Sequence, residues 1–216
     1  MTGNDRITLH YMPQTRAAGT RIILEELGAS YDLHVMNMKA GENREPGYLS
    51  INPLGKVPAI EHRGKLVTEQ IAIAIYLGDL FPQAGLAPAV DDPNRGPYLR
   101  WLIYYAACFE PALMDKFRNV DLGPITQSVY GTYDTMLDVL EGALSNGPYI
   151  LGDRLSLADI QWGVALNWTM MFGMVPQRPR FVEYRDRIAA RPSFAKVWAD
   201  DAAMAEKHAA LATANG

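Results

Sequence analysis

The chain has 216 residues, 49% of them hydrophobic, which is enough for one large domain or two small ones with proper cores. Its 20 basic and 24 acidic residues give a net charge of -4, so the charge balance provides no reason to expect nucleic acid as a partner. A single cysteine, Cys108, excludes an intrachain disulfide, and the first residues lack the basic and then apolar layout of a secretory signal, so a globular cytoplasmic protein is expected.

The first part of the chain predicts a strand, a helix and a second strand. Residues 7–11 are mostly apolar or β-prone, residues 20–27 carry apolar positions before Gly28, which suits a helix end, and residues 31–36 are again strand-like. Such a βαβ unit has a right-handed crossover and two parallel strands.

A hairpin and a helix follow. Residues 57–61 and 65–67 flank the short turn His62-Arg63-Gly64, and a helix is predicted from Glu69 to about Leu80. The order β-α-β and then β-β-α is the thioredoxin-like arrangement, so residues 1–82 are expected to form an α/β domain of this type.

Two features of this half suggest a ligand site. If the Val57-Pro58 bond is cis, the N–H and C=O of Val57 face outward and are free to pair with an extended ligand backbone. Thr68 is the expected N-cap of the next helix, where the free amides of Glu69, Gln70 and Ile71 would stabilise a ligand carboxylate. Glu69 is also placed to hold an ammonium group.

The second half of the chain predicts helices alone. Four prolines between residues 81 and 98 indicate a linker, assigned to residues 83–97, and residues 98–216 are expected to form an all-helical domain. The helical patterns extend over 94–117 with a kink near Pro111, 125–145, 157–172, 180–190 and 194–210.

The helix after residue 156 has the clearest start signal. Ser156 is the expected N-cap, Asp159 occupies the N3 position of a capping box, and Leu155 and Ile160 form a hydrophobic staple. The helix is apolar on nearly every face, so it should run through the centre of its domain, and Asp159 is interpreted as structural. The longest apolar stretch of the chain, roughly residues 160–175, falls short of the ~20 residues that span a bilayer, so no membrane span is expected.

Several of these motifs resemble the cytosolic glutathione transferase family. The run from Asn52 to Pro58 and the helix start Thr68-Glu69-Gln70-Ile71 resemble its glutathione site, while residues 152–159 and 189–194 resemble the capping motif and the late helix break of its helical domain. The resemblance covers almost the whole chain. It implies a bacterial-type member that binds glutathione in the first domain, a hydrophobic electrophile in the second, and a second copy of itself as a homodimer.

The resemblance also implies roles for the two motifs. Val57, before Pro58, would pair with the cysteinyl backbone of glutathione, and Glu69 and Gln70 would hold its γ-glutamyl end. Gln70 stands where the family usually has Ser, although a carboxamide also donates to a carboxylate. Lys56 could meet a ligand carboxylate or be an ordinary surface lysine.

A transferase must also keep the glutathione sulfur as a thiolate, because a free thiol has a pKa of about 8.5. In the family a Tyr, Ser or Cys at or after the end of the first strand does so, and residues 10–21 contain no Ser or Cys. Tyr11 is the first candidate and Thr15 the second, and the alternative for Tyr11 is an ordinary packed aromatic. Arg16 stands where the cysteine-type pattern has Cys; it could favour the thiolate or hold the glycine carboxylate, or be a solvated loop residue.

Other reactive side chains carry less information. The four histidines lack metal-ligand spacing, so no metal site is assigned. Cys108 lies on an apolar helix face and is expected to be inert. The larger side chains of that helix should be mostly core, with some lining an electrophile pocket; they are Trp101, Tyr104, Tyr105, Met114 and Phe117.

The sequence therefore favours a glutathione transferase over two alternatives. One is a glutathione-dependent disulfide reductase, favoured if Thr15 rather than Tyr11 contacts the sulfur. The other is a non-catalytic binding or regulatory protein that retains the fold. A thioredoxin-type dithiol mechanism is excluded, because it needs a Cys-x-x-Cys after the first strand.

Overall fold

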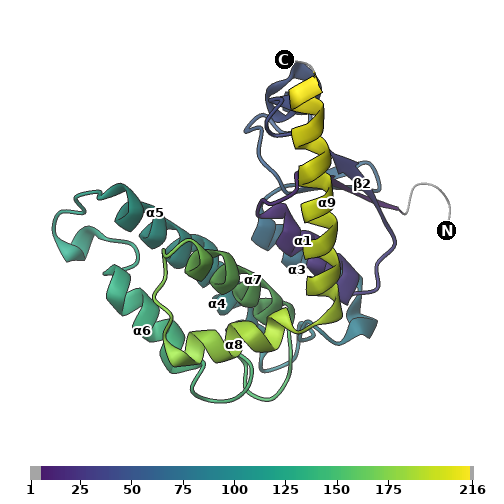
Figure 1. Ribbon diagram of the computed structural model, residues 1–216. Helices are drawn as coiled ribbons and strands as arrows, with labels where there is room; N and C mark the ends of the chain where they lie inside the picture. The colour runs from purple at the N-terminus through teal and green to yellow at the C-terminus, as the bar shows by residue number, and fades with distance from the viewer. Residues whose placement is uncertain (1–5, 215–216) are drawn as a thin grey trace. The chain divides into compact units, whose positions relative to one another are not determined.

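The computed structural model describes residues 6–214, with side chains up to residue 211, as two compact units (Figure 1). The first unit combines the residues up to 84 with those from 192 onward, and the second comprises residues 85–191. Within the described part of the chain, no helix is both long and apolar enough to cross a bilayer.

The first unit contains a four-stranded mixed sheet with the strand order β2-β1-β3-β4. β1 pairs in parallel with β2 and antiparallel with β3, which pairs antiparallel with β4. This is the predicted thioredoxin-like βαβ-ββα arrangement. The elements of this unit are β1 (Ile7–Tyr11), α1 (Ala17–Glu26), β2 (Tyr31–Val35), a 3-10 turn (Glu42–Arg44), α2 (Pro46–Leu49), β3 (Ala59–His62), β4 (Lys65–Val67), α3 (Gln70–Leu80), a 3-10 turn (Pro82–Ala84) and α9 (Pro192–Ala214).

The core of this unit lies between the sheet and its helices. Ile7, Leu9 and Tyr11 alternate along β1 and are almost fully buried, as are Ile22 and Ile23 of α1. A strand with period-2 alternation presents one apolar face, which a helix with buried aliphatic residues covers. The end of β1 is therefore held rigidly, and the loop that follows it starts from a fixed point.

Helix α9 packs along α1 in this unit, as Figure 1 shows. Phe194, Val197 and Asp201 are buried at positions i, i+3 and i+7, on one face of the helix. The sequence prediction places all of residues 98–216 in one helical domain after a linker at 83–97. In the structure, the residues from 192 onward, which form α9, belong instead to the first unit. Helical periodicity predicts the buried face of a helix but not its packing partner.

Polar pairs also join α9 to α1. Arg21 of α1, which is buried, donates to Asp200, and Lys196 Nζ lies 2.7 Å from Glu25 Oε2. Tyr31 donates to Glu25 at 2.6 Å and accepts from Arg21 Nε at 3.1 Å. These partners satisfy Nε and Nη2 of the buried guanidinium, while its Nη1 is buried without a hydrogen-bond partner among the described residues.

The second unit is helical in its described residues, as predicted, and α7 runs through its centre. α7 is buried over most of its length, with Trp162 in edge contact with Phe109 at 4.9 Å between ring centroids. The helices of this unit are α4 (Arg95–Tyr104), a π-helical turn (Tyr105–Phe109), α5 (Glu110–Arg118), a 3-10 turn (Ile125–Gln127), α6 (Tyr133–Ala143), α7 (Leu157–Met171) and α8 (Pro179–Ala189).

Two predicted helices differ in detail from the structure. The helix predicted over 94–117 is interrupted by the π-helical turn, because Pro111 has no N–H to donate to the carbonyl of Ala107. The helix predicted over 125–145 begins at Tyr133, since Gly131 has a left-handed backbone and the Thr132 hydroxyl caps the amide of Thr135 at 3.0 Å.

The capping box at the start of α7 is confirmed. One Asp159 oxygen accepts from the Ile150 amide and the Tyr184 hydroxyl, each at 2.7 Å, and the other accepts from the amide and the hydroxyl of Ser156, each at 2.8 Å. Burial raises the pKa of Asp159, and these four hydrogen bonds act in the opposite direction. Asp159 is thus structural, as predicted.

Replacing Asp159 by Ala should lower the free energy of unfolding by about 3 kcal/mol or more, because buried donors lose their acceptor at roughly 1–3 kcal/mol each. Urea unfolding measures this. Asp153→Ala, an exposed carboxylate six residues earlier, is the matched control and should change stability by less than about 0.5 kcal/mol. Equal effects of the two variants would contradict the structural role of Asp159.

Candidate functional site

Three segments of the first unit meet at the end of β1. Met12, after β1, packs in one apolar cluster with Met36 and Tyr48, and Val57 lies against that cluster. At the other side of the loop, the Gln70 side chain at the start of α3 donates to the Arg16 carbonyl at 3.3 Å. The structure thus places the turn before Pro58 and the first residues of α3 against the β1–α1 loop.

The turn before Pro58 lies outside the sheet ladder, and side-chain hydrogen bonds hold its backbone. The Val57-Pro58 bond is cis, and the β3 ladder begins only at Ala59, so Val57 lies outside the sheet pairing. The Lys56 carbonyl accepts from the Tyr48 hydroxyl at 2.6 Å and from the buried Asn52 side chain at 2.9 Å. The sequence prediction missed this role of Tyr48 and Asn52; only Asn52, within the motif itself, gave a signal. The Lys56 side chain is exposed.

Gly55 closes this turn against the preceding segment. Its φ is +61°, and a Cβ at this position would lie 2.7 Å from the Asn43 carbonyl oxygen. The Asn43 side chain donates to the Gly55 carbonyl at 2.9 Å, and Arg44 donates to the Leu54 carbonyl at 3.1 Å. Only glycine fits both the backbone conformation and the space.

The start of α3 differs by one residue from the prediction. Glu69, not Thr68, is the N-cap, with φ 64° and ψ 113°, and α3 begins at Gln70. The left-handed backbone of Glu69 prevents an earlier start. Because the first amides of a helix have no partner within it, those of Gln70 and Ile71 remain available at the positive end. The Glu69 side chain is exposed and Gln70 is half-buried.

The Tyr11 hydroxyl is already used within the protein. Tyr11 is fully buried, and its hydroxyl donates to Asp201 of α9. Burial and the neighbouring Asp201 carboxylate strongly raise the pKa of Tyr11, while Arg21, whose guanidinium carbon lies 5.6 Å from the ring centroid, acts in the opposite direction. A phenol has one proton, so donation to a ligand would require breaking the bond to Asp201.

Thr15 and Arg16 lie just before α1. Thr15 is half-buried, and its hydroxyl donates to the Met12 carbonyl at 2.7 Å and accepts from the Ala17 amide at 3.3 Å. Arg16 is the N-cap residue of α1 and its side chain is exposed. Thr15 is therefore the more accessible hydroxyl of the two that the sequence singles out.

Metal ligands and reactive thiols are not gathered here. Among the described residues, no group of three or more His, Cys, Asp or Glu is placed to hold a metal ion. Cys108, half-buried in the second unit, has its pKa raised by burial. A raised pKa disfavours the nucleophilic thiolate.

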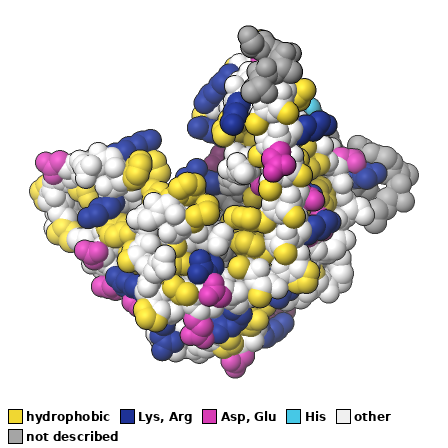
Figure 2. Space-filling model, viewed as in Figure 1, with side chains coloured by type: hydrophobic (Ala, Val, Ile, Leu, Met, Phe, Trp, Pro, Cys, Tyr) yellow, Lys and Arg dark blue, Asp and Glu magenta, His cyan; other side chains and the backbone are white. Residues whose placement is uncertain are grey.

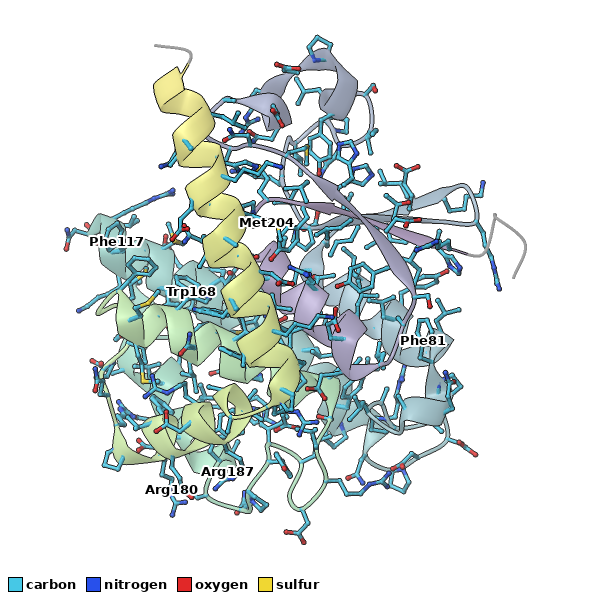
Figure 3. All side chains as sticks on the ribbon, turned by 45° about the vertical axis from the view of Figure 1, so that its right-hand side comes forward. Phe81, Phe117, Trp168, Arg180, Arg187 and Met204 are labelled. Atoms are coloured by element: carbon cyan, nitrogen blue, oxygen red, sulfur yellow. The ribbon has the colours of Figure 1, made fainter. Side chains whose placement is uncertain are left out.

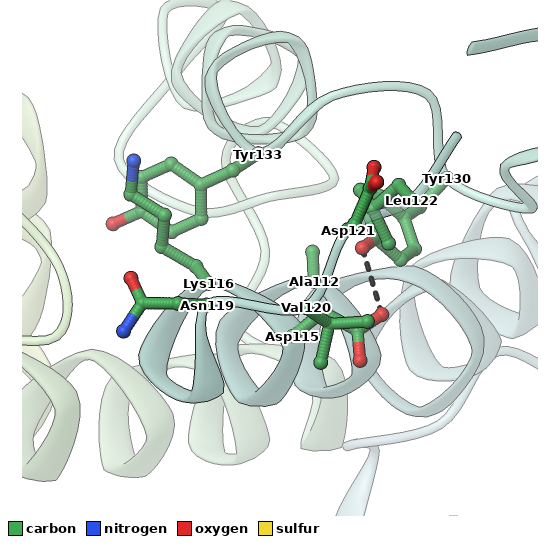
Figure 4. Close-up of a pocket in the computed structure, with 9 residues that line it drawn as sticks. All are labelled: Ala112, Asp115, Lys116, Asn119, Val120, Asp121, Leu122, Tyr130 and Tyr133. Carbon is green, nitrogen blue, oxygen red and sulfur yellow. Dashed lines mark hydrogen bonds between the residues drawn. The ribbon is translucent and has the colours of Figure 1, made fainter. Parts of the chain in front are cut away.

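The second unit contains a pocket of about 300 Å³ between α5 and α6 (Figure 4). In it the Tyr130 hydroxyl donates to Asp115 at 2.8 Å, and Lys116 Nζ lies 5.5 Å from the centroid of the Tyr133 ring. Its lining residues are Ala112, Asp115, Lys116, Asn119, Val120, Asp121, Leu122, Tyr130 and Tyr133. None of the five large side chains that the sequence suggested for an electrophile pocket is among them.

Those five side chains divide between core and surface. Trp101 and Tyr105 are buried against Trp162, as expected for core residues, whereas Phe117 at the end of α5 is 68% exposed (Figure 3). Tyr104 and Met114 are half-buried. Figure 2 shows further hydrophobic side chains at the surface of the part of the second unit that carries α5, where Val120 and Val129 are exposed.

This fold and this site define a class of proteins: a thioredoxin-like unit with a cis-proline turn, followed by helices. Comparison with known families agrees. The model of the glutathione S-transferase N-terminal domain matches residues 6–79, and that of the C-terminal domain matches residues 127–192. The chain belongs to the glutathione S-transferase family.

Individual relatives are distant but extend over nearly the whole chain. A glutathione S-transferase of Hyoscyamus muticus is 26% identical over 201 residues, which is 85% of this chain and 94% of the relative. A maleylacetoacetate isomerase of Pseudomonas aeruginosa is 28% identical over 195 residues, or 85% and 91% of the two chains. The structure of a sphingomonad glutathione S-transferase complexed with glutathione has a TM-score of 0.75 and 26% identity, covering 90% of this chain and 98% of its own.

The two glycines Gly55 and Gly64 test whether the turn before Pro58 is closely packed. Both have a left-handed φ, so alanine costs about 1–2 kcal/mol at each. A Cβ added at position 64 meets open space, whereas a Cβ added at position 55 would displace the Asn43 carbonyl. Gly55→Ala should therefore lower the free energy of unfolding by at least ~1 kcal/mol more than Gly64→Ala. Denaturant unfolding measures both, and equal losses would show that the turn tolerates a side chain.

Proposed function

We propose that this protein is a glutathione transferase, which binds glutathione in the first unit and directs its thiolate at a hydrophobic electrophile. One observation carries the proposal: the Val57 backbone, which lies outside the sheet ladder, and the start of α3 both lie against the β1–α1 loop. An extended thiol peptide needs a backbone partner, a carboxylate site and a group beside its sulfur, and these three segments supply one each.

The residues have distinct roles in glutathione binding. Val57, before Pro58, pairs with the cysteinyl backbone of glutathione through its N–H and C=O. The Gln70 side chain and the α3 amides hold the γ-glutamyl carboxylate, and Glu69 holds the ammonium group. Lys56 and Arg16 are the exposed cations nearest to these segments along the chain, and they hold the glycine carboxylate.

For the thiolate we propose Thr15 in first place and Tyr11 in second, which reverses the order that the sequence suggests. The Thr15 hydroxyl can turn from the Met12 carbonyl to the glutathione sulfur, whereas the Tyr11 proton is held by Asp201 in the core. The thiol proton leaves to solvent, the sulfur forms a bond to the electrophilic carbon, and the leaving group departs with the bonding electrons. The positive end of α1 and the Arg16 charge lower the thiol pKa further.

Two other glutathione reactions fit the same site. The position of Thr15 favours a disulfide reductase as the second candidate, in which the thiolate attacks a disulfide sulfur. The maleylacetoacetate isomerase relative favours a third outcome, in which glutathione adds to a substrate and leaves again. Turnover of aryl halides, mixed disulfides and activated alkenes distinguishes the three reactions.

A homodimer, expected from the family, completes the proposal. Size-exclusion chromatography tests the dimer.

The Thr15 role predicts the titration of bound glutathione. The ultraviolet absorbance of the thiolate should show a thiol pKa below the free value of about 8.5 in the wild type, and a return toward that value in Thr15→Ala. Thr15→Ser keeps the hydroxyl and should behave as the wild type does, while Tyr11→Phe should raise the thiol pKa less than Thr15→Ala. The reverse order of Tyr11→Phe and Thr15→Ala would return the role to Tyr11. A wild type that binds glutathione without lowering its pKa would favour the non-catalytic alternative.

The carboxylate site at α3 is tested by charge. Gln70→Glu should weaken glutathione binding about tenfold or more, roughly 1.4 kcal/mol, because two carboxylates then face each other. Gln83→Glu makes the same change at an exposed position outside the site and should leave affinity within about twofold. Isothermal titration calorimetry measures both, and unaltered binding in Gln70→Glu would place the γ-glutamyl end elsewhere.

A further inference from the structure

We propose that Asp201 of α9 is a positioning residue for the thiol chemistry, which holds the β1–α1 loop in the conformation that presents Thr15 to the glutathione sulfur. This inference rests on the proposed function of the same site. It assigns a role to a helix near the end of the chain, for which the sequence motifs of the site give no signal.

The Asp201 carboxylate holds the loop at two points. One oxygen accepts from the Tyr11 hydroxyl at the end of β1, and the other accepts from the Gln14 backbone amide at 2.8 Å. Asp201 is only 5% exposed, so water competes little for either bond. The stretch from Tyr11 to Gln14 is therefore fixed at both ends by a single side chain.

The backbone of Gln14 needs such a partner. Its φ is 57°, in the left-handed region that residues other than glycine rarely adopt. A hydrogen bond from its amide to a buried carboxylate is of the strong, charge-assisted kind, and it favours this conformation over the extended alternatives. Asp201 thus stabilises the bend that turns the chain from β1 toward Thr15.

The contact reaches Thr15 through Met12. The Thr15 hydroxyl donates to the carbonyl of Met12, which lies between the two anchored residues, and α1 begins two residues later. On the far side of Thr15, the Arg16 carbonyl is held by Gln70 of α3. The position of the Thr15 hydroxyl therefore depends on where Asp201 places Met12.

The charges around Asp201 are balanced within the same unit. Burial and the neighbouring Asp200 carboxylate raise the pKa of Asp201, while the Tyr11 hydroxyl, the Gln14 amide and the Arg21 guanidinium act in the opposite direction. Arg21 itself donates to Asp200, the neighbouring residue of α9. Asp200 is thus a carboxylate on the same helix that contacts α1 but not the loop, and it provides a matched control.

The experiment compares Asp201→Asn with Asp200→Asn, Thr15→Ala and the double variant of Asp201→Asn with Thr15→Ala. The thiol pKa of bound glutathione is measured from thiolate absorbance, and glutathione affinity by calorimetry. Asn has nearly the same shape as Asp, but its side chain has a single oxygen. It therefore cannot accept from both the Tyr11 hydroxyl and the Gln14 amide as the two carboxylate oxygens do. The thiolate fraction at neutral pH should fall about threefold or more while the affinity stays within about twofold, because Val57 and Gln70 are untouched.

The double variant separates positioning from a general loss of structure. If Asp201 acts through Thr15, the double variant should match Thr15→Ala alone, because the two changes remove one effect. Asp200→Asn should leave the thiol pKa at the wild-type value. An unchanged thiol pKa in Asp201→Asn, an equal shift in Asp200→Asn, or additive shifts in the double variant would each overturn the inference.

Amide hydrogen exchange keeps the test independent of the ligand. Residues 12–17 should exchange faster in Asp201→Asn than in the wild type and in Asp200→Asn, without any glutathione present. Unchanged exchange rejects the positioning role whatever the thiol titration shows. A wild type that does not bind glutathione rejects the proposed function, and faster exchange in Asp201→Asn would then still identify Asp201 as the residue that holds the loop.

Discussion

The contact of Asp201 with the end of β1 is the constraint on which the candidate site depends. It joins residues 190 positions apart and places a carboxylate of the last helix against a phenol and a backbone amide of the first loop. A buried carboxylate costs free energy unless its oxygens accept hydrogen bonds, so the helix and the loop can each take this arrangement only when the other is present. The loop conformation is therefore a property of the folded unit rather than of its own residues.

The remaining parts of the site follow the same rule, because backbone groups make most of it and side chains hold them in place. Tyr48 and Asn52 fix the Lys56 carbonyl before Pro58, and Gly55 lets the turn close on Asn43. Backbone amides and carbonyls recognise an extended peptide without depending on particular side chains. The proposed site therefore depends little on Gln70 and Thr15 being residues that the family does not usually carry.

The second unit is organised around packing. Trp162 and the rings near it fill the centre, and the four hydrogen bonds of Asp159 join the start of α7 to Ile150 and Tyr184. Such a core fixes the helices, while side chains at the surface, such as Phe117 and Val129, take little part in that packing. Under the proposed function, apolar side chains at that surface would accept electrophiles of different shapes, because apolar contacts discriminate weakly between them.

The sequence alone determined the elements and the motifs, because both depend on residues close together in the chain. Alternation in β1, the capping box at Ser156 and the run from Asn52 to Pro58 each act over a few residues, and the structure retains them. Only the tertiary structure decided that α9 joins the first unit and that the Tyr11 proton is held by Asp201. Local pattern shows that a helix has a buried face and that a tyrosine ends a strand, whereas the partner of each is chosen by packing between distant segments, which no local signal encodes.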